Sequence, residues 1–411
     1  MDSINRTNRT DRRRCRTKRR KASRPTCSRD RHSILLKQGL VIMEISIIVP
    51  CRNEGANVEI LTNRILRAVP GDVTYEIVFV DDSSDDTPER LDRMSRQFSF
   101  VRYLHRENGG GLSSAILEGC RMAKGDWFIV MDADLQHPPE SLPALIEEIR
   151  SERSEVIVPS RFIPGGSDGG LNAWRRLVSW TARMMARLLI RKVWKVTDPT
   201  SGYFAVRRDV AFSRPLQPIG WKILLELLVR SDYSNVREIP YSFHSRDLGS
   251  SKLNLKEQWN YIRHLGRLLR SSESDMRFWI FCAVGLSGVA VNTLVYVLLV
   301  HLGVPIGFSF AGATIVATFN NFTWNNLLTW KDSKSDKLWY RIFKFSLVSL
   351  SGLCLSSFIV TCFHSWFGVH YLVAGLIGIL VSTGSNFALN NVWTFKKLPA
   401  ILSPISKDPP L

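Results

Sequence analysis

Cysteine follows no pattern in this sequence of 411 residues. The seven cysteines, at positions 15, 27, 51, 120, 282, 354 and 362, are scattered, and none belongs to a C-x-x-C pair. Disulfide frameworks and zinc sites need paired or regularly spaced cysteines. The sequence therefore argues against both.

Glycine motifs for nucleotide phosphates are also missing. The glycine run at 109–111 has neither the G-x-G-x-x-G spacing of a dinucleotide-binding turn nor the sequence of a P-loop. A Rossmann dinucleotide site and a Walker site are therefore not predicted.

The first 42 residues lack the long hydrophobic core of a signal peptide. Residues 1–42 hold 14 Lys and Arg against 3 Asp, which is +11 of the formal net charge of +18. Without an apolar period, this segment is expected to be a disordered basic arm. If this basic segment had a function, it would be to bind nucleic acid or anionic lipid. Met43 directly precedes the first predicted strand, so we expect translation to start there and no nucleic-acid partner.

The region that follows, 43–255, has the pattern of an α/β domain. Short β-branched runs at 45–49, 75–80, 101–105 and 127–131 alternate with helical patterns near 57–68, from 87 onward and at 112–123. This alternation is typical of a mostly parallel sheet. Ligands bind outside the carboxyl ends of the strands in such sheets, and all the polar turns of this region follow strands.

Acidic side chains follow three of these strands. Glu54 comes after the first strand, Asp82 after the second, and Asp132, Asp134 and Gln136 after the fourth. We expect them to face one crevice, since the strands end at the same edge. The side chains after the fourth strand offer only oxygen ligands, which suit an Mg²⁺ or Mn²⁺ ion that also binds substrate phosphates. Glu54 or Asp82 would accept hydrogen bonds from a ribose or base, although each acid alone is also compatible with a turn or helix cap.

Five motifs carry a family resemblance. They are Pro-Cys-Arg-Asn-Glu at 50–54, Val-Asp-Asp-Ser-Ser-Asp at 80–85, Gly-Leu-Ser-Ser-Ala at 111–115, Asp-Ala-Asp-Leu-Gln-His at 132–137 and Ser-Arg-Phe at 160–162. In this order they resemble the family 2 inverting glycosyltransferases, and most closely the dolichyl-phosphate (polyprenyl-phosphate) mannose synthases. The resemblance implies a GT-A (Rossmann-like) fold and a nucleotide-sugar donor.

The resemblance also implies a donor site. The residues around the nucleoside would be Pro50, Arg52, Glu54, Val80 and Asp82, and those around the metal and diphosphate would be Asp132, Ala133, Asp134 and Gln136. The metal ligands among them would be Asp132, Asp134 and Gln136. The family often has Tyr at the position of Arg52. Because of this departure, the resemblance says less about how the base is bound.

The acceptor side follows in the second half of the domain. Residues 171–192 place Arg beside apolar residues at helical spacing, which indicates an amphipathic helix at a membrane interface or, alternatively, an ordinary surface helix. By resemblance, Arg161, Arg175 and Ser179 would hold the phosphate of a lipid. Arg246 and Lys252 stand in a Gly/Ser loop similar to the mobile acceptor loop of the family and would neutralise the diphosphate. The expected catalytic residues are Asp134, Arg161, Arg246 and Lys252.

The expected reaction is the inverting transfer of mannose from GDP-mannose to dolichyl or another polyprenyl phosphate. A phosphate monoester is already an anionic nucleophile at neutral pH, so no strong general base is needed. Two alternatives stay open: transfer of glucose or another hexose from a UDP-sugar, and a lipid-sugar translocation module with a regulatory transferase domain.

The C-terminal part has the composition of a membrane domain. Apolar runs at roughly 278–300, 305–328, 342–363 and 370–393 are each long enough to cross a bilayer. We expect an interfacial linker helix at 256–275, an all-α four-helix transmembrane domain at 276–397 and a tail at 398–411. Lys and Arg cluster between the second and third runs and after the fourth. The positive-inside rule therefore predicts a multi-pass protein of the cell membrane with both termini and the catalytic domain in the cytoplasm.

The membrane part contains an internal repeat. Phe281–Gly288 corresponds to Phe345–Gly352, 64 residues later, and Asn321–Lys331 corresponds to Asn386–Lys396, 65 later. This pattern predicts two helical hairpins of the same plan and resembles the GtrA-like membrane domain. The repeated Asn residues would bond between helices or meet the head group of a lipid.

Overall fold

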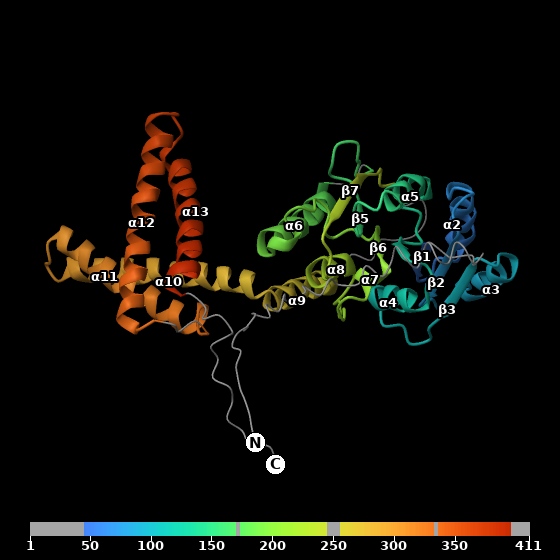
Figure 1. Cartoon of the computed structure of the whole chain (residues 1–411), viewed down its shortest axis with the longest axis horizontal. Helices are drawn as coiled ribbons and strands as arrows, with labels where there is room; N and C mark the ends of the chain where they lie inside the picture. Colours follow the sequence, from blue (N-terminus) through green and yellow to red (C-terminus); the bar gives the residue numbers. More distant parts are fainter. Residues whose placement is uncertain (1–44, 170–172, 245–254, 333–335, 396–411) are drawn as a thin grey trace, which may run out of the picture.

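The computed structural model describes residues 45–169, 173–244, 255–332 and 336–395. An α/β domain lies at one end of an elongated molecule, and long helices lie at the other (Figure 1). The expected basic arm, the expected loop residues Arg246 and Lys252, and the tail lie outside the described residues, as does the side chain of Arg175.

The α/β domain is built on a seven-stranded sheet of order β3-β2-β1-β4-β6-β5-β7. All neighbouring strands are parallel except β6, which is antiparallel to β4 and β5. The strands are β1 (Ile45–Cys51), β2 (Tyr75–Asp81), β3 (Val101–His105), β4 (Trp127–Val130), β5 (Val156–Ser160), β6 (Phe204–Arg207) and β7 (Val236–Pro240). The mostly parallel sheet predicted from the sequence is therefore confirmed.

Helices cover both faces of this sheet. One apolar core lies under α2 (Gly55–Ala68), α3 (Thr87–Gln97) and α5 (Leu142–Arg150). The other lies under α4 (Leu112–Met122), α6 (Ala173–Leu189), α7 (Arg208–Ala211), α8 (Ile223–Arg230) and α9 (Leu255–Ser271). The buried strands β1, β2 and β4 contribute side chains alternately to the two faces, as expected for a sheet covered on both sides.

A buried charged cluster joins the domain to α9. Glu226 of α8 is fully buried, and its Oε2 lies 2.6 Å from Nε2 of His264 in α9. Burial opposes ionisation of Glu226, but hydrogen bonds from His264 and from the backbone N–H of Gln217 outweigh it, so the pKa of Glu226 is lowered. Glu226 is therefore a buried acid paired with His264.

The C-terminal helices form two hairpins. The first consists of α10 (Glu273–His301) and α11 (Ile306–Trp324), and the second of α12 (Leu338–Ser365) and α13 (Tyr371–Leu389). Among the described residues, α10, α12 and the segment Tyr371–Thr394 are long and apolar enough to cross a membrane, and α11 is not in that group. The fourth span expected from the sequence therefore stays a prediction.

The predicted repeat is visible in the packing of the two hairpins. Asn321 lies against Gly288 in the first hairpin, and Asn386 lies against Gly352 in the second, each so closely that a β-carbon on the glycine would overlap the amide. Both hairpins end in a π-helical turn, at Asn325–Thr329 and Asn390–Thr394. The hairpins meet there, where Trp330 stacks on Phe395 with ring centroids 4.5 Å apart. Helix packing thus accounts for Asn321 and Asn386.

The turn before β4 yields a stability prediction. A β-carbon on Gly125 would stand 2.7 Å from the backbone nitrogen of Ser46 and 2.8 Å from the carbonyl carbon of Ile45, neither of which can move without shifting β1. Gly125→Ala is expected to lower the free energy of unfolding by about 1–3 kcal/mol. Thermal melting of the detergent-solubilised protein measures this as a fall in Tm. Gly71→Ala is the control, since nothing lies within 4 Å of that position, and an equal fall in both variants would contradict the packing argument.

Candidate active site

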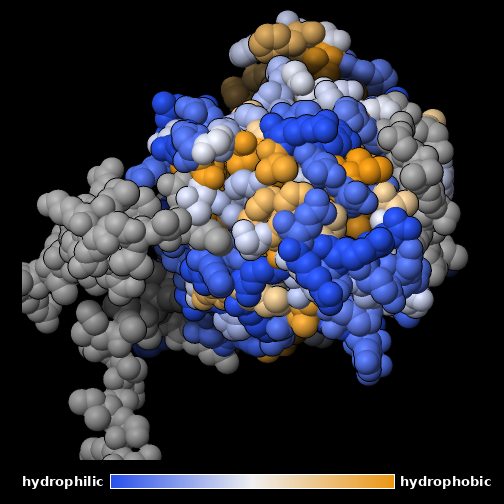
Figure 2. All heavy atoms as spheres, turned by 90° about the vertical axis from the view of Figure 1, so that its right-hand side faces the viewer, coloured by the Kyte–Doolittle hydropathy of each residue, from blue (hydrophilic) through white to orange (hydrophobic). Residues whose placement is uncertain are grey.

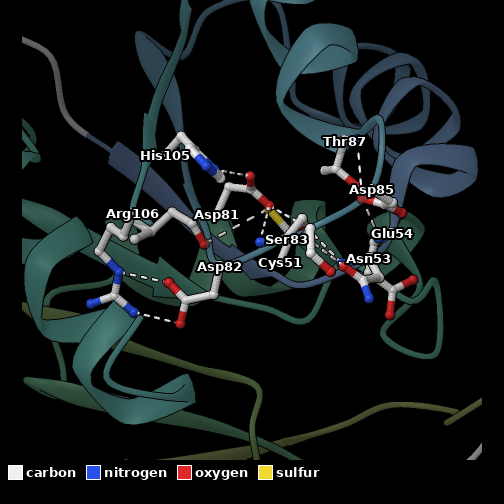
Figure 3. A network of polar contacts seen from close by, with 12 residues as sticks. Cys51, Asn53, Glu54, Asp81, Asp82, Ser83, Asp85, Thr87, His105 and Arg106 are labelled. Carbon is white, nitrogen blue, oxygen red and sulfur yellow. Dashed lines mark hydrogen bonds and ion pairs between the residues drawn. The ribbon is translucent and has the colours of Figure 1, made fainter. Parts of the chain in front are cut away.

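The turns after β1 and β2 are bonded to each other at the carboxyl edge of the sheet. Cys51 and Asp81 are paired residues at the ends of the two strands. Beyond them, the backbone N–H of Asn53 donates to Ser83 Oγ at 2.7 Å, and the backbone N–H of Ser84 donates to Asn53 Oδ1 at 3.0 Å. These bonds fix the two turns as one rigid rim (Figure 3).

Asp81 is the buried centre of this rim. Its carboxylate accepts hydrogen bonds from the hydroxyl and backbone N–H of Ser83, and its Oδ2 lies 2.7 Å from Nδ1 of His105. Cys51 also donates to it. Burial, and then the charge of Asp81, raises the pKa of the Cys51 thiol well above its ordinary value. Cys51 therefore stays protonated as a donor, and the cluster is structural.

The predicted nucleoside residues lie along this rim. Pro50 and Val80 are paired and buried, so they offer backbone rather than side-chain contacts. Arg52 is exposed and Glu54 is half-buried, with its Oε2 accepting from Asn57 at 2.7 Å. The structure thus brings the predicted residues together on two adjacent strands.

Asp82 has a partner that the sequence did not predict. Nε and Nη2 of Arg106 each donate to one Asp82 oxygen at 2.7 Å (Figure 3). Nη1 of Arg106 donates to Ser114 Oγ at 3.1 Å. Arg106 follows β3, two strands from β1.

The turn after β4 carries the predicted metal ligands. The side chain of Asp132 is about one third exposed, whereas Asp134 is largely buried and accepts from the backbone N–H of Gln136 at 3.1 Å. Leu135 has a φ of +62°, a conformation that is uncommon outside glycine and that marks strained functional turns. Ala133 is buried beside them.

These ligands fit a divalent cation that is shared with phosphates. Within the described part of the chain, no group of three His, Cys, Asp or Glu side chains could enclose an ion. Two carboxylates and an amide are instead the donor set with which proteins hold Mg²⁺ or Mn²⁺ against a substrate diphosphate. The amide nitrogen of Gln136 donates to the carbonyl of His244 at 3.3 Å, which leaves the amide oxygen as its acceptor atom.

His137 positions Asp132 and was not singled out by the sequence. It is stacked on Tyr203, and its Nδ1 accepts the backbone N–H of Asp132 at 3.1 Å. Burial lowers the pKa of His137 to about 4, so the ring is neutral at physiological pH and Nδ1 is free of a proton. Gly202 closes the cluster, since a β-carbon there would stand 3.1 Å from Asp132 Oδ2.

The predicted acceptor residue Arg161 is held by a buried acid. Nε and Nη2 of Arg161 donate to Oδ2 of the fully buried Asp198 at 3.1 and 3.0 Å. The guanidinium lies 4.9 Å from the ring centroid of Phe243. Burial opposes the charge of Arg161, but Asp198 outweighs it, so the pKa of Arg161 is raised. Arg161 is thus a fixed cation.

Helix α6 adds a second cation next to Arg161. Ser179 lies on α6 half-buried, and Arg183 follows one turn later. Arg183 stands over the ring of Phe162 at 3.3 Å from the centroid and donates to the Thr197 carbonyl at 3.2 Å. The spacing of four residues from Ser179 to Arg183 would have indicated that the two side chains share one face of the helix.

Lys222 is a further cation that the sequence did not predict. Its ammonium group donates to the Thr200 carbonyl at 2.9 Å, beneath the loop that carries Asp198. Burial lowers the pKa of Lys222, and Asp198 and Asp132 partly offset this because their charges act on it. Lys222 is therefore bound to the loop that also carries Asp198 and Gly202. A lysine just before an apolar helix gives no sequence signal of its own.

Comparisons with known proteins agree with this layout. Residues 46–212 match the family model described as glycosyl transferase family 2, and residues 280–395 match one described as GtrA/DPMS, transmembrane domain. A solved structure of glucosyl-3-phosphoglycerate synthase from Mycobacterium tuberculosis is similar at a TM-score of 0.44 and 21% identity, covering 58% of this chain and 81% of that one.

Curated relatives are more similar. The chain is 41% identical over 349 residues to a dolichol-phosphate mannosyltransferase of Pyrococcus furiosus, which covers 85% of this chain and 98% of that protein. It is 37% identical over 238 residues to a dolichol-phosphate mannosyltransferase of Saccharomyces cerevisiae (55% and 87%). It is 31% identical over 221 residues to an undecaprenyl-phosphate mannosyltransferase of Micrococcus luteus (52% and 88%).

The close approach of Gly202 to Asp132 predicts how the metal site responds to mutation. Gly202→Ala is expected to displace the Asp132 carboxylate and to weaken Mn²⁺ binding in the presence of pyrophosphate by about 10- to 100-fold. Electron paramagnetic resonance of free Mn²⁺ measures the affinity. Gly266→Ala, which introduces a β-carbon into open space on α9, should leave it unchanged. Unaltered affinity in Gly202→Ala would contradict the role of Gly202 in fixing the Asp132 carboxylate.

Proposed function

Since this chain belongs to the dolichol-phosphate mannosyltransferases of glycosyl transferase family 2, we propose that it transfers mannose from GDP-mannose to dolichyl or another polyprenyl phosphate with inversion. One observation carries the proposal. The acids after β4 lie at the same edge of the sheet as three basic side chains from other elements, namely Arg161, Arg183 and Lys222. A diphosphate with its metal and a phosphate acceptor need such a pairing of opposite charges.

The donor lies across β1, β2 and β4 in this proposal. The nucleoside contacts the rim formed by residues 50–54 and 80–82, and the diphosphate reaches Asp132, Asp134 and Gln136. These three residues would hold Mg²⁺ or Mn²⁺, which when bound supplies positive charge to the diphosphate leaving group. His137 and Gly202 keep Asp132 in place for this role.

The acceptor phosphate binds to the fixed cations of β5 and α6. Asp198 holds Arg161 so that its guanidinium cannot turn away, and Arg183 is fixed over Phe162. Guanidinium groups suit this role because they bind phosphate oxygens bidentately. Ser179 extends the same face of α6, and Arg175, whose side chain lies outside the described residues, stays a predicted member of the phosphate site.

The transfer then needs alignment rather than a base. A phosphate oxygen of the acceptor forms a bond to the anomeric carbon of mannose while the bond from that carbon to the diphosphate oxygen breaks, and GDP leaves with the electron pair. The acceptor is already anionic at neutral pH. Positioning and charge stabilisation therefore provide the rate acceleration. Lys222 and the predicted loop residues Arg246 and Lys252 stabilise the charge that develops on the diphosphate.

The chain is a multi-pass membrane protein, and we place its catalytic domain and both termini on the cytoplasmic side of the cell membrane. Helix α6 exposes Trp174, Leu177 and Trp180, and α9 exposes Trp259 and Ile262. Apolar side chains on basic helices suit a membrane interface. The face of the domain farthest from the membrane helices is mainly hydrophilic with small separate apolar patches (Figure 2).

A panel of donors tests the proposal. Radiolabelled GDP-mannose, UDP-glucose and UDP-N-acetylglucosamine are each incubated with a short polyprenyl phosphate, Mg²⁺ or Mn²⁺ and the detergent-solubilised full chain. Label should reach the lipid from GDP-mannose alone. Label that reaches the lipid from a UDP-sugar would leave the proposed mechanism standing but would change the assigned donor. No transfer from any donor would favour a translocation role for the membrane domain.

Asp134 is expected to be essential for turnover. Asp134→Ala should reduce kcat at least about 100-fold because it removes a ligand of the diphosphate-bound cation. The same radiolabel assay measures the rate, and an unchanged Tm would show that the variant is folded. Asp126→Ala removes an exposed acid just before β4 and serves as the control. A folded Asp134→Ala protein with full turnover would remove Asp134 from the site.

Lys222 is expected to act on the reaction and not only on stability. Lys222→Met should lower kcat by about 100-fold, since it removes a half-buried basic group beside the developing charge. Lys192→Met is the matched control, because Lys192 also donates to backbone carbonyls, those of Val229 and Ser231, but away from the site. Equal losses of kcat in both variants would assign Lys222 a structural role only.

A further inference from the structure

The second membrane hairpin contains a buried arginine with no acid beside it. Arg341 lies in the first turn of α12 and is 6% exposed. Its Nη1 donates to Asn326 Oδ1, in the π-helical turn that ends the first hairpin, whereas its Nε has no hydrogen-bond partner. Within the described ranges no carboxylate forms an ion pair with Arg341, and Asp336, the nearest acid along the chain, is paired with Lys344. A buried charge without a counter-ion is unfavourable, so Arg341 needs an anion.

The internal repeat shows how the first hairpin neutralises the equivalent arginine. Arg277 of α10 stands 64 residues before Arg341, the same separation as between Phe281 and Phe345. The Arg277 side chain is 12% exposed and forms ion pairs with Glu273 and Asp332. The first hairpin therefore supplies its own counter-ions.

Both of these acids are replaced by lysine in the second hairpin. Lys337 stands 64 residues after Glu273, and Lys397 stands 65 residues after Asp332. Lys337 is exposed one turn before Arg341, and Lys397 lies outside the described residues. The two halves of the repeat thus share an arginine but differ in the sign of the charges that accompany it. The anion for Arg341 must then come from outside the protein.

Arg341 lies at the level of lipid phosphates in the proposed membrane orientation. It belongs to the end of the bundle where Lys and Arg cluster, which faces the cytoplasm by the positive-inside rule. Trp339 and Tyr340, directly before it, are exposed, and such aromatic side chains are enriched at the headgroup level. Asn326 is half-buried, so its pair with Arg341 reaches the surface of the bundle. The anion available at this level is the phosphate of a lipid.

We propose that Arg341 and Asn326 form a binding site in the membrane domain for the phosphate of an anionic lipid. Asn326 holds the guanidinium through Nη1, and Nε remains to donate to a phosphate oxygen. Basic pockets between membrane helices on the cytoplasmic side are typical sites for anionic headgroups. This proposal rests on the proposed membrane orientation but not on the proposed donor or acceptor.

Two kinds of lipid carry such a phosphate. A phospholipid such as phosphatidylglycerol has a phosphodiester with one negative charge. A polyprenyl phosphate has a monoester, whose second pKa is about 6, so most of it carries two charges at neutral pH. The first lipid would occupy the site as a structural component of the bundle. The second would make the membrane domain a store of the proposed acceptor.

Native mass spectrometry of the detergent-solubilised full chain tests the proposal. The chain is titrated with phosphatidylglycerol, a short polyprenyl phosphate, zwitterionic phosphatidylcholine or inorganic phosphate. The wild type should bind at least one of the two anionic lipids about tenfold more tightly than phosphatidylcholine. Arg341→Met should weaken that binding at least about tenfold, because it removes charge-assisted hydrogen bonds. Arg341→Lys, which keeps the charge but not the planar fork, should weaken it about threefold.

Arg277→Met is the matched control. It removes the equivalent arginine of the first hairpin, whose counter-ions belong to the protein, and should leave the lipid affinity within about twofold of the wild type. Arg341→Met leaves no acid unpaired, so it should melt at the wild-type Tm in detergent without added lipid. A lower Tm together with unchanged lipid binding would assign Arg341 a structural role and overturn the proposal.

The remaining outcomes also decide the matter. Equal lipid affinity in the wild type, Arg341→Met and Arg341→Lys would overturn the site, as would an equal loss in Arg277→Met. Binding of inorganic phosphate without either lipid, or of phosphatidylcholine as tightly as the anionic lipids, would overturn it too. The anionic lipid whose binding depends on Arg341 identifies the source of the phosphate. Failure of the donor panel would overturn the proposed function and leave this site standing, since the two assays share no readout.

Discussion

The buried ion pair between Asp198 and Arg161 is the interaction on which the site depends. Asp198 is fully buried, and loss of one partner from such a pair leaves an uncompensated charge at a cost of about 3–5 kcal/mol. The loop that carries Asp198 also holds Lys222 through Thr200 and approaches Asp132 through Gly202. One loop therefore contacts two of the basic side chains and a proposed metal ligand.

The sheet and its carboxyl edge could be predicted from the sequence because their signals are local. Strands of parallel sheets are continuous apolar runs, and the polar turns after β1, β2 and β4 follow them directly. The sequence could also predict that Asp132, Asp134 and Gln136 lie close together, since all three belong to one turn. The antiparallel β6 carried no comparable signal because its direction depends on its neighbours in the sheet.

The residues that the sequence did not reveal are those whose roles come from contacts between distant segments. Arg106 meets Asp82 across 24 residues, and the pKa of His137 is lowered chiefly because the folded chain buries its ring. Lys222 looks like the start of an ordinary helix until the Asp198 loop covers it. Glu226 illustrates the opposite case: its partner His264 lies 38 residues away, and the contact makes it structural. Residue type alone cannot distinguish these roles.

The connection between the catalytic domain and the first membrane helix has a kinetic consequence. Trp279 of α10 donates to the Leu189 carbonyl of α6 at 3.1 Å, and Tyr261 of α9 donates to the Ala182 carbonyl at 2.6 Å. These bonds attach α6, which carries proposed acceptor residues, to α9 and to the first membrane helix. A substrate dissolved in the bilayer then reaches the site by lateral diffusion, so its encounter with the enzyme is a search in two dimensions and depends on surface density rather than on bulk concentration.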